Sequence, residues 1–362
     1  MDENNKNTIE EQPKTKKIWL NLIVVAIVLG LVVFLVYQLV GDINSVIEHF
    51  KQTNIWYILL AVALMLVFVV TTALSGHSVF LYSGEKINLT NSYLIQSTEM
   101  FFNGITPFSM GAAPIQGYYY HKCGASASKT TGVLLTQFII YQLLITILST
   151  VFLIIFLSDI NIALTQKAGF GWYIIIIGYT INCIIFFFLI FLSFSKTTRK
   201  IVTFFIGLIC KIKPLRKYKD KWLEQANIFT DNLQESMTLL VKNKKIFFIS
   251  TLIRLISLLV YYSIPAVIVY AMGYNISNSS QFFYIMASSI LATTTMMWVP
   301  LPGASGGTET AFLILLNLPM LSFSSESGSA VAAIMLLWRF ITYYFGMVYG
   351  GINYLILKRR IK

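Results

Sequence analysis

The chain has 362 residues, of which 56% are hydrophobic and only 12% are charged, and its mean hydropathy is +0.72. A soluble domain carries about 25% charged residues, so this composition excludes an ordinary soluble protein and indicates an integral membrane protein. The net charge of +12 comes from basic residues that flank apolar runs, as the positive-inside rule describes, and we expect no nucleic acid partner.

Six apolar runs are long enough to cross a hydrocarbon core of about 30 Å as helices. They comprise residues 18–40, 55–75, 132–157, 172–194, 246–272 and 330–357. Strands of a membrane β-barrel need only about ten residues of alternating character, so the sequence predicts an all-α polytopic membrane protein. We expect one transmembrane domain over 18–357, with halves of about 18–158 and 172–357 and short tails at 1–17 and 358–362.

Lysine and arginine gather before the first run, after the last run and in the link at 196–245. By the positive-inside rule, both termini and this basic link are expected in the cytoplasm, as in a multi-pass protein of the cell membrane. Within the link, residues 201–210 are apolar between basic neighbours. That pattern fits either a helix lying on the membrane surface or an extension of the fourth span.

Two further apolar stretches, at 93–120 and 281–321, are interrupted by proline and glycine. A broken helix at membrane depth is tolerated only where protein or a watery cavity surrounds it, because every backbone polar group needs a partner there. We therefore expect re-entrant hairpins, the first entering from the cytoplasm and the second from outside. With Pro107 placed over Pro300, the two halves form an inverted repeat, which is typical of alternating-access transporters. The alternative of two unrelated breaks stays open.

Four charged residues lie within apolar surroundings, namely Glu99, Arg254, Glu309 and Arg339. A charge at mid-bilayer costs at least about 2.5–3.5 kcal/mol and so usually faces a partner or a cavity. One interpretation is that these charges neutralise one another and hold helices together. The other is that guanidinium groups bind a lipid phosphate, which suits their fork geometry, while carboxylates hold a cationic headgroup or an arginine.

The second break also predicts an anion site. Backbone N–H groups freed at 300–307, and the start of a short helix near Thr308, are expected to face a cavity where the helix dipole favours a phosphate. Glu309 lies near that start, and we expect Arg339 on the last span to pair with it as a gate.

The stretch VPLPGASGGTETA (299–311) resembles the P-x-P-G-G-x-G-x-x-E-A signature of the flippase-like membrane domain of lysylphosphatidylglycerol synthases, the multiple peptide resistance factors. WRFITYYFGMVYGG (338–351) resembles the arginine-containing last helix of that family, and NGITPFSMGAAPIQG (103–117) resembles its earlier Asn, Pro and Gly segment. With the embedded charges Glu99 and Arg254, the site candidates that follow are Pro300, Pro302, Gly303, Gly307, Glu309, Arg339, Asn103, Pro107 and Gly111.

The chain departs from the family pattern at Ala304 and Ser305, where a second glycine is usual, and at Gln137, where an arginine is expected. The resemblance implies lipid translocation. It does not imply synthase activity, because the family's lysyl transfer belongs to a separate soluble domain that follows the membrane region, and only residues 358–362 follow the last span here. We therefore expect no enzyme.

Other chemistry has weaker support. The segment GASGG (303–307) matches the nucleophile pattern G-x-S-x-G, and an intramembrane serine hydrolase would need a base beside Ser305. Cys123, Cys183 and Cys210 lack the spacing of a metal site, and no P-loop is present. We expect no cofactor and no metal.

The sequence thus predicts a flippase-like translocase that moves a polar-headed lipid, such as an aminoacyl-phosphatidylglycerol or a glycolipid, between leaflets. Its expected partners are membrane lipids with an anionic or aminoacylated headgroup. The main alternative is a membrane scaffold that recruits a lipid- or glycan-modifying enzyme through the basic link at 196–245.

Overall fold

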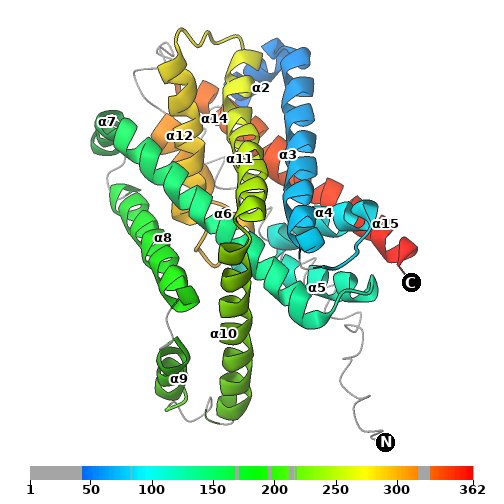
Figure 1. Ribbon diagram of the computed structural model, residues 1–362. Helices are drawn as coiled ribbons and strands as arrows, with labels where there is room; N and C mark the ends of the chain where they lie inside the picture. Colours follow the sequence, from blue (N-terminus) through cyan, green and yellow to red (C-terminus); the bar gives the residue numbers. More distant parts are fainter. Residues whose placement is uncertain are drawn as a thin grey trace, which may run out of the picture.

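The computed structural model describes residues 43–82, 84–167, 171–194, 198–211, 216, 218–316 and 327–361. Helices make up most of this part of the chain, which contains no strand, so the all-α prediction is confirmed (Figure 1). In chain order the elements are α2 (Ile43–Gln52), α3 (Ile55–Tyr82), α4 (Leu89–Ile105), the 3-10 turn η1 (Pro107–Ser109), α5 (Ala112–Lys122), α6 (Ala127–Ile155), α7 (Leu157–Lys167), α8 (Gly171–Phe194), α9 (Thr198–Ile209), α10 (Lys219–Lys242), α11 (Lys244–Ala271), α12 (Ser279–Met296), the 3-10 turn η3 (Pro302–Ala304), α13 (Gly307–Leu316), α14 (Ser327–Arg339), the π-helical turn η5 (Phe340–Phe345) and α15 (Gly346–Arg360).

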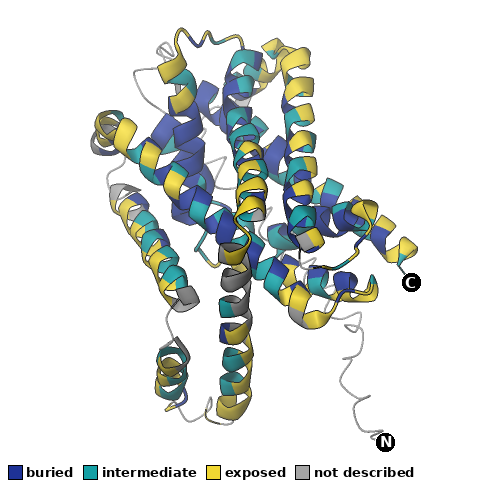
Figure 2. Cartoon of the chain, viewed as in Figure 1, coloured by how far each residue is buried: buried dark blue, intermediate teal, exposed yellow. Residues whose placement is uncertain are grey.

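Four helical segments of the described part are long and apolar enough to cross a membrane. They are Ile55–Leu81, Lys129–Ile155, Phe247–Ala271 and Gly328–Arg360, and they match four predicted spans. The predicted span at 172–194 falls on α8, whose apolar segment is shorter, and the one at 18–40 lies outside the described residues. Figure 2 shows exposed residues along the outer sides of α3 and α8, where many of the exposed side chains are large and apolar, as a lipid-facing surface requires.

Helices α3 and α11 lie side by side and run in opposite directions (Figure 1). At one end, the N–H of Asn54 donates to the carbonyl of Ala271 (2.7 Å). Further along, the hydroxyl groups of Thr72 and Ser257 share a hydrogen bond of 2.7 Å. Because α3 leads into the first hairpin and α11 into the second, the two hairpins start from opposite ends of the bundle.

Each half of the chain repeats one order of elements: a long helix, a broken hairpin and a second long helix. The packing repeats with it, since α3 lies on α4 as α11 lies on α12, and α4 lies on α15 as α12 lies on α6. Both hairpins also start with the same cap. The side chains of Asn88 and Asn278 accept backbone N–H groups from the first turns of α4 and α12. The inverted order predicted from the sequence is therefore present in the fold.

The register of this repeat differs from the predicted one. Pro107 and Pro302 each open a 3-10 turn, whereas Pro300 is exposed and precedes its turn. The next residues also match, with φ and ψ of 57° and 11° at Phe108 and of 58° and 18° at Gly303. The alignment of Pro107 with Pro300 was wrong by two residues, because the segment Pro-Leu-Pro offers two prolines and composition does not distinguish them.

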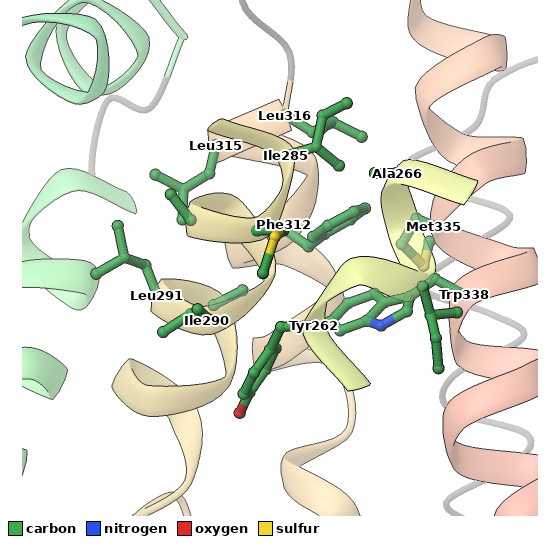
Figure 3. Packing of buried hydrophobic residues seen from close by; sticks show 14 of the residues in the cluster. Tyr262, Ala266, Ile285, Ile290, Leu291, Phe312, Leu315, Leu316, Met335 and Trp338 are labelled. Carbon is green, nitrogen blue, oxygen red and sulfur yellow. The ribbon is translucent and has the colours of Figure 1, made fainter. Parts of the chain in front are cut away.

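The second hairpin lies at the centre of the hydrophobic core. Most residues of α12 are buried, and the helix packs against α6, α8, α11 and α13 (Figure 2). Figure 3 shows Phe312 of α13 among side chains from neighbouring helices, with its ring centroid 4.3 Å from that of Trp338. The helices on both sides of the second break are therefore held by buried apolar contacts, whereas Pro300 and Leu301 within the break are exposed.

The last long helix changes its winding directly after Arg339. The π-helical turn η5 separates α14 from α15, and such turns are frequent at functional sites. Beyond it, Gly350 allows α15 to lie close to α4, because a Cβ atom at this position would be 2.7 Å from the carbonyl oxygen of Ser97.

The basic link forms two helices, α9 and α10, which pack on each other, and α10 also packs on α6 and α8. The apolar segment at 201–210 falls on α9, which is a helix of its own and exposes Phe204 and Phe205.

Candidate functional site

The tips of the two hairpins contact each other, and the residues of the first tip, Pro107–Ser109, are exposed. The turn η1 packs on η3, and α4 also contacts η3. In the described part of the chain, three residues other than glycine have a positive φ: Phe108 (57°), Ser109 (52°) and Ala304 (49°), all at these tips. The left-handed conformation costs such a residue about 1–2 kcal/mol, and local strain of this kind clusters at functional sites. We therefore take the meeting point as the candidate site.

The second tip is closed by a buried ion pair. Glu309 and Arg339 are 3% and 6% exposed, and Arg339 Nε donates to Glu309 Oε1 at 2.6 Å. A second guanidinium nitrogen, Nη2, donates to the carbonyl of Gly303 at 3.1 Å. The pair predicted from the sequence is thus present, and it joins α13, the last long helix and the turn η3.

Glu309 also caps its own helix. It is the third residue of α13, and its Oε2 accepts the backbone N–H of Gly306 at 2.7 Å. A carboxylate at this position commonly reaches back to the residue before the helix. The sequence led us to expect a bound phosphate at this helix start, but in the structure the carboxylate of Glu309 already lies there. The negative group at the start of α13 is therefore the side chain of Glu309 itself.

Tyr343 connects this pair to the first hairpin. The guanidinium of Arg339 lies 4.6 Å from the centre of the Tyr343 ring, and the Tyr343 hydroxyl donates to the carbonyl of Gly104 at 2.8 Å. The same ring occupies the place where a Cβ atom of Gly303 would be, and Gly303 has a φ of 58°. Only glycine fits that position.

The first tip is closed by neutral groups. Asn103 Oδ1 accepts the N–H of Ala112 (3.0 Å), and Thr106 Oγ1 accepts the N–H of Gly111 (2.9 Å). These are N–H groups at the start of α5, where no intrahelical partner exists. Asn103 and Gly111, together with Pro107 at the start of η1, therefore build the turn itself.

Beside this tip, glutamine side chains form a buried cluster between α4, α5 and α6. Gln96 Nε2 donates to Gln137 Oε1 at 2.9 Å and to the Tyr120 hydroxyl at 3.1 Å. Gln116 Nε2 is 3.4 Å from Gln96 Oε1. Gln137, where the family resemblance predicts an arginine, thus belongs to a network without charge.

A short repeat that we did not recognise in the sequence explains the position of Gln137. The segment QFIIY (137–141) on α6 corresponds to RFITY (339–343) on the last long helix. In the first half, the cation over the tyrosine comes from another helix: the guanidinium of Arg254 on α11 lies 5.2 Å from the Tyr141 ring centre. The repeat was visible in the sequence, whereas the contribution of Arg254 depends on tertiary packing.

Glu99 and Arg254 are not paired with each other. Among the described residues, neither forms an ion pair within 4.0 Å, and both are partly buried. Asn103 Nδ2 is 3.5 Å from Glu99 Oε1. Arg254 Nε is buried and has no hydrogen-bond partner in the described part of the chain.

The remaining candidates have mainly local contacts. Pro302 is buried, and Gly307 packs against Met296. The hydroxyl of Ser305 donates to the carbonyl of Pro302 (2.8 Å), and no histidine of the described part is hydrogen-bonded to it. The described residues contain no cluster of His, Cys, Asp or Glu that could hold a metal ion.

Comparison with known proteins identifies the family. A family model described as the lysylphosphatidylglycerol synthase TM region matches residues 21–350. The chain belongs to this family. It is also 24% identical over 319 residues to a UPF0104 membrane protein of Archaeoglobus fulgidus, covering 86% of this chain and 90% of that protein. The family resemblance expected from the motifs is confirmed, and the protein is a membrane protein of this group.

Proposed function

We propose that this protein moves a polar-headed lipid between the two leaflets of the cell membrane. The observation that carries this proposal is the contact between η1 and η3. It brings together two broken hairpins that start from opposite ends of an apolar bundle. Broken elements that meet near the midplane form the substrate site in many inverted-repeat transporters. The hairpins would then be re-entrant, each leaving the membrane on the side where it entered.

The buried pair of Glu309 and Arg339 is our candidate for the gate of this transporter. It joins the second tip to the last long helix, and through Tyr343 to the first hairpin. Separating the two charges would free the second tip from both contacts. Because the separated charges would then need other partners in a low-dielectric interior, a charged lipid headgroup is a suitable replacement.

Lipid transfer in reconstituted vesicles tests the proposal, with headgroup accessibility as the measurement. The double variant Glu309→Gln/Arg339→Gln removes both charges and leaves a neutral amide at each position, so neither charge is left uncompensated. We expect it to fold and to lose transfer. The matched control is Glu85→Gln/Lys129→Gln, which neutralises an ion pair of 3.5 Å (Nζ to Oε1) at the end of the segment Lys129–Ile155, away from both hairpin tips, and we expect it to transfer lipid normally.

Wild-type protein that transfers lipid no faster than empty vesicles would contradict the proposed function. A double variant that transfers lipid at the wild-type rate would leave the function intact but remove the gating role of the pair.

We also propose that the chain does not itself make an aminoacylated lipid, since the family match covers the TM region of the synthases. Purified protein supplied with lysyl-tRNA and phosphatidylglycerol is expected to form no lysyl lipid. Product above a protein-free control would reveal a catalytic site. A separate lipid-modifying enzyme is then the expected source of an aminoacylated substrate.

The proposed orientation places both termini and the basic link in the cytoplasm. Single cysteines at Asn44, Asn161 and Asn275 should then react with a membrane-impermeant reagent on intact cells. Cysteines at Lys217 and Lys362 should not react, and labelling at position 217 would overturn the orientation.

A further inference from the structure

Helix α9 of the basic link exposes apolar side chains along one side. These exposed residues are Phe204, Phe205, Leu208 and Ile209. At about 100° per residue they fall within a sector of about 140°, and Phe204 is 67% exposed. Contiguous exposed apolar residues mark surfaces that contact another protein or a membrane.

The other sides of α9 are accounted for. The helix lies beyond the end of α8 and packs on α10 (Figure 1). Val202 contacts the main hydrophobic cluster, and Cys210, which follows the helix, is buried. Lys200 and Thr203 lie on a third side, where the Thr203 hydroxyl donates to the carbonyl of Lys200 (2.9 Å). The helix therefore has one side for the protein, one polar side and one exposed apolar side.

The position of α9 in the chain brings it to a lipid surface. Helix α8 exposes Phe187 and Phe191, and its apolar segment runs to Phe191. Helix α8 ends at Phe194 and α9 begins at Thr198. The peptide units between these two residues span at most about 14 Å. The exposed side of α9 thus begins within reach of the membrane surface at which α8 ends.

The surroundings of α9 carry positive charge. Within residues 196–221, Asp220 is the only acidic residue among many lysines and arginines. Lys200, Lys211 and Lys219 are exposed at the start of α9, after its end and at the start of α10. An apolar stripe beside basic residues is typical of a helix in the interface of a membrane, and anionic lipids attract such basic segments. An anionic leaflet supplies both the apolar layer and the negative charge.

We propose that α9 anchors the basic link to the membrane surface, with its apolar side at the boundary between headgroups and acyl chains of an anionic leaflet. The lysines around it then lie at the level of the lipid phosphates. Of the two interpretations of residues 201–210, this one fits a helix that starts anew at Thr198 and keeps a polar side. Because α10 packs on α6 and α8, the anchor holds the link against two spans.

The test measures the depth of single labelled cysteines in the full chain, reconstituted in vesicles. The native cysteines are first replaced: Cys123→Ser, Cys183→Ser and Cys210→Ala. An environment-sensitive fluorophore is then attached at Phe205→Cys or Leu208→Cys, with Thr203→Cys on the polar side of the same helix as the matched control. The vesicles contain phosphatidylcholine alone or with phosphatidylglycerol, and lipids brominated on their acyl chains serve as quenchers.

The labels on the apolar side should report a lipid environment. In vesicles with phosphatidylglycerol, emission from positions 205 and 208 should shift to shorter wavelength and be lost to the brominated lipids. The label at position 203 should keep the emission of an aqueous environment. Quenching at 205 and 208 should decrease in phosphatidylcholine alone and at high salt, because salt screens the attraction between lysines and anionic lipids.

The double variant Lys200→Gln/Lys211→Gln tests the charges. Combined with Phe205→Cys, it should reduce quenching in vesicles with phosphatidylglycerol and leave quenching in phosphatidylcholine unchanged. The control, Lys358→Gln/Arg359→Gln, removes the same charge at the exposed end of α15 and should leave quenching as it is. Melting curves in detergent should match for both pairs, since all four side chains are exposed.

The unlabelled wild type gives a second measurement that needs no cysteine replacement. Cleavage by trypsin after Lys211 and Lys219 should be slower in vesicles with phosphatidylglycerol than in phosphatidylcholine alone. Equal cleavage rates in the two kinds of vesicle would contradict the anchor.

The label experiment has three further outcomes against the proposal. A label at position 205 that is shielded from water without being quenched by lipid would identify a protein partner on this side of α9. Equal quenching at 203 and 205 would show that α9 continues the fourth span. Equal quenching in both kinds of vesicle, or a label at 205 that stays in water, would overturn the anionic leaflet as the partner. Lipid transfer enters none of these measurements, so failure of the proposed function would leave the anchor standing.

Discussion

The two hairpin tips share a backbone and differ in chemistry. Phe108 and Gly303 have nearly the same φ and ψ, and each follows the proline that opens its turn. In the first half, Asn103 and Thr106 accept the free N–H groups at the start of the next helix. In the second half, Glu309 takes that role and also pairs with Arg339.

A broken helix of this geometry therefore does not require charge. The first tip closes with amide and hydroxyl groups, and Gln137 stands in the short repeat where Arg339 stands in the second half. Burying two charges is expensive, so the second half carries a cost that the turn itself does not demand. The proposed gating role of the pair would account for that cost.

The largest expected effect comes from leaving one charge of the second tip without its partner. Arg339→Gln should lower the free energy of unfolding by about 3–5 kcal/mol, because Glu309 would stay buried and uncompensated. The matched change in the first half, Gln137→Leu, removes a neutral hydrogen bond and should cost about 1 kcal/mol. Melting curves in one detergent measure both. Equal losses would mean that the two halves differ less than their chemistry indicates.

Substitutions at the shared left-handed position should have effects of different size in the two halves. In Gly303→Ala the new Cβ atom would overlap the Tyr343 ring, and alanine would have to adopt a positive φ. We therefore expect the free energy of unfolding to fall by about 2 kcal/mol or more. Phe108→Gly relieves the strain of a positive φ but increases the conformational entropy of the unfolded chain. Because the two effects oppose each other, the free energy of unfolding should change by less than about 1 kcal/mol. A stable Gly303→Ala protein would show that the second tip is looser than described.

Removing the neutral cap of the first tip should have a moderate effect. Asn103→Ala leaves the N–H of Ala112 without its acceptor and should cost about 1 kcal/mol, the usual size for a lost helix cap. Hydrogen exchange at residues 111–113 should rise together with the loss of stability. If lipid transfer fell in Asn103→Ala while stability did not, the residue would have a role beyond the turn.

The smallest expected effect concerns pH and occurs in the first half alone. Backbone hydrogen bonding from Ser126, with support from its hydroxyl and from Lys129, lowers the pKa of Glu85 from its usual 4.5. A lowered pKa stabilises the fold above the unfolded pKa, and the gain is lost as pH falls through the folded value. Glu85→Gln should therefore cost a few tenths of a kcal/mol at pH 7, and the difference should vanish in acid.

The corresponding loop before the second hairpin, residues 273–278, contains no acidic residue. A change there, such as Asn275→Ala, should leave the acid dependence of melting as it is in wild type. A Glu85→Gln protein whose difference from wild type persisted below pH 3 would contradict the assigned cause.

Much of the fold could be predicted from local patterns. Apolar length identified four spans, and proline with glycine identified both hairpins. The four embedded charges were also evident, since charge is rare in such surroundings. The pairing of Glu309 with Arg339 was predictable because both charges lie in apolar surroundings, where each needs a partner of opposite sign.

The features that could not be predicted depend on contacts between distant segments. Pro-Leu-Pro does not reveal which proline opens the turn, so the register of the repeat was wrong. Arg254 comes from α11 to the Tyr141 ring of α6, and no spacing within either helix indicates that contact. The carboxylate of Glu309 accepts an N–H group at the start of its own helix. The sequence pattern alone does not show whether such a helix start is occupied by a side chain or is open to an anion.

The π-helical turn after Arg339 acts as a one-residue insertion that sets the phase of everything beyond it. An α-helix turns by about 100° per residue, so rewinding Phe340–Phe345 as a regular α-helix without removing a residue would rotate α15 by about that angle. Gly350, which now lets α4 approach closely, would leave that interface, and a side chain would take its place. The six residues of this π-helical turn therefore set the rotation of α15, which packs on α4 of the first hairpin, relative to α14, which carries Arg339 of the second tip.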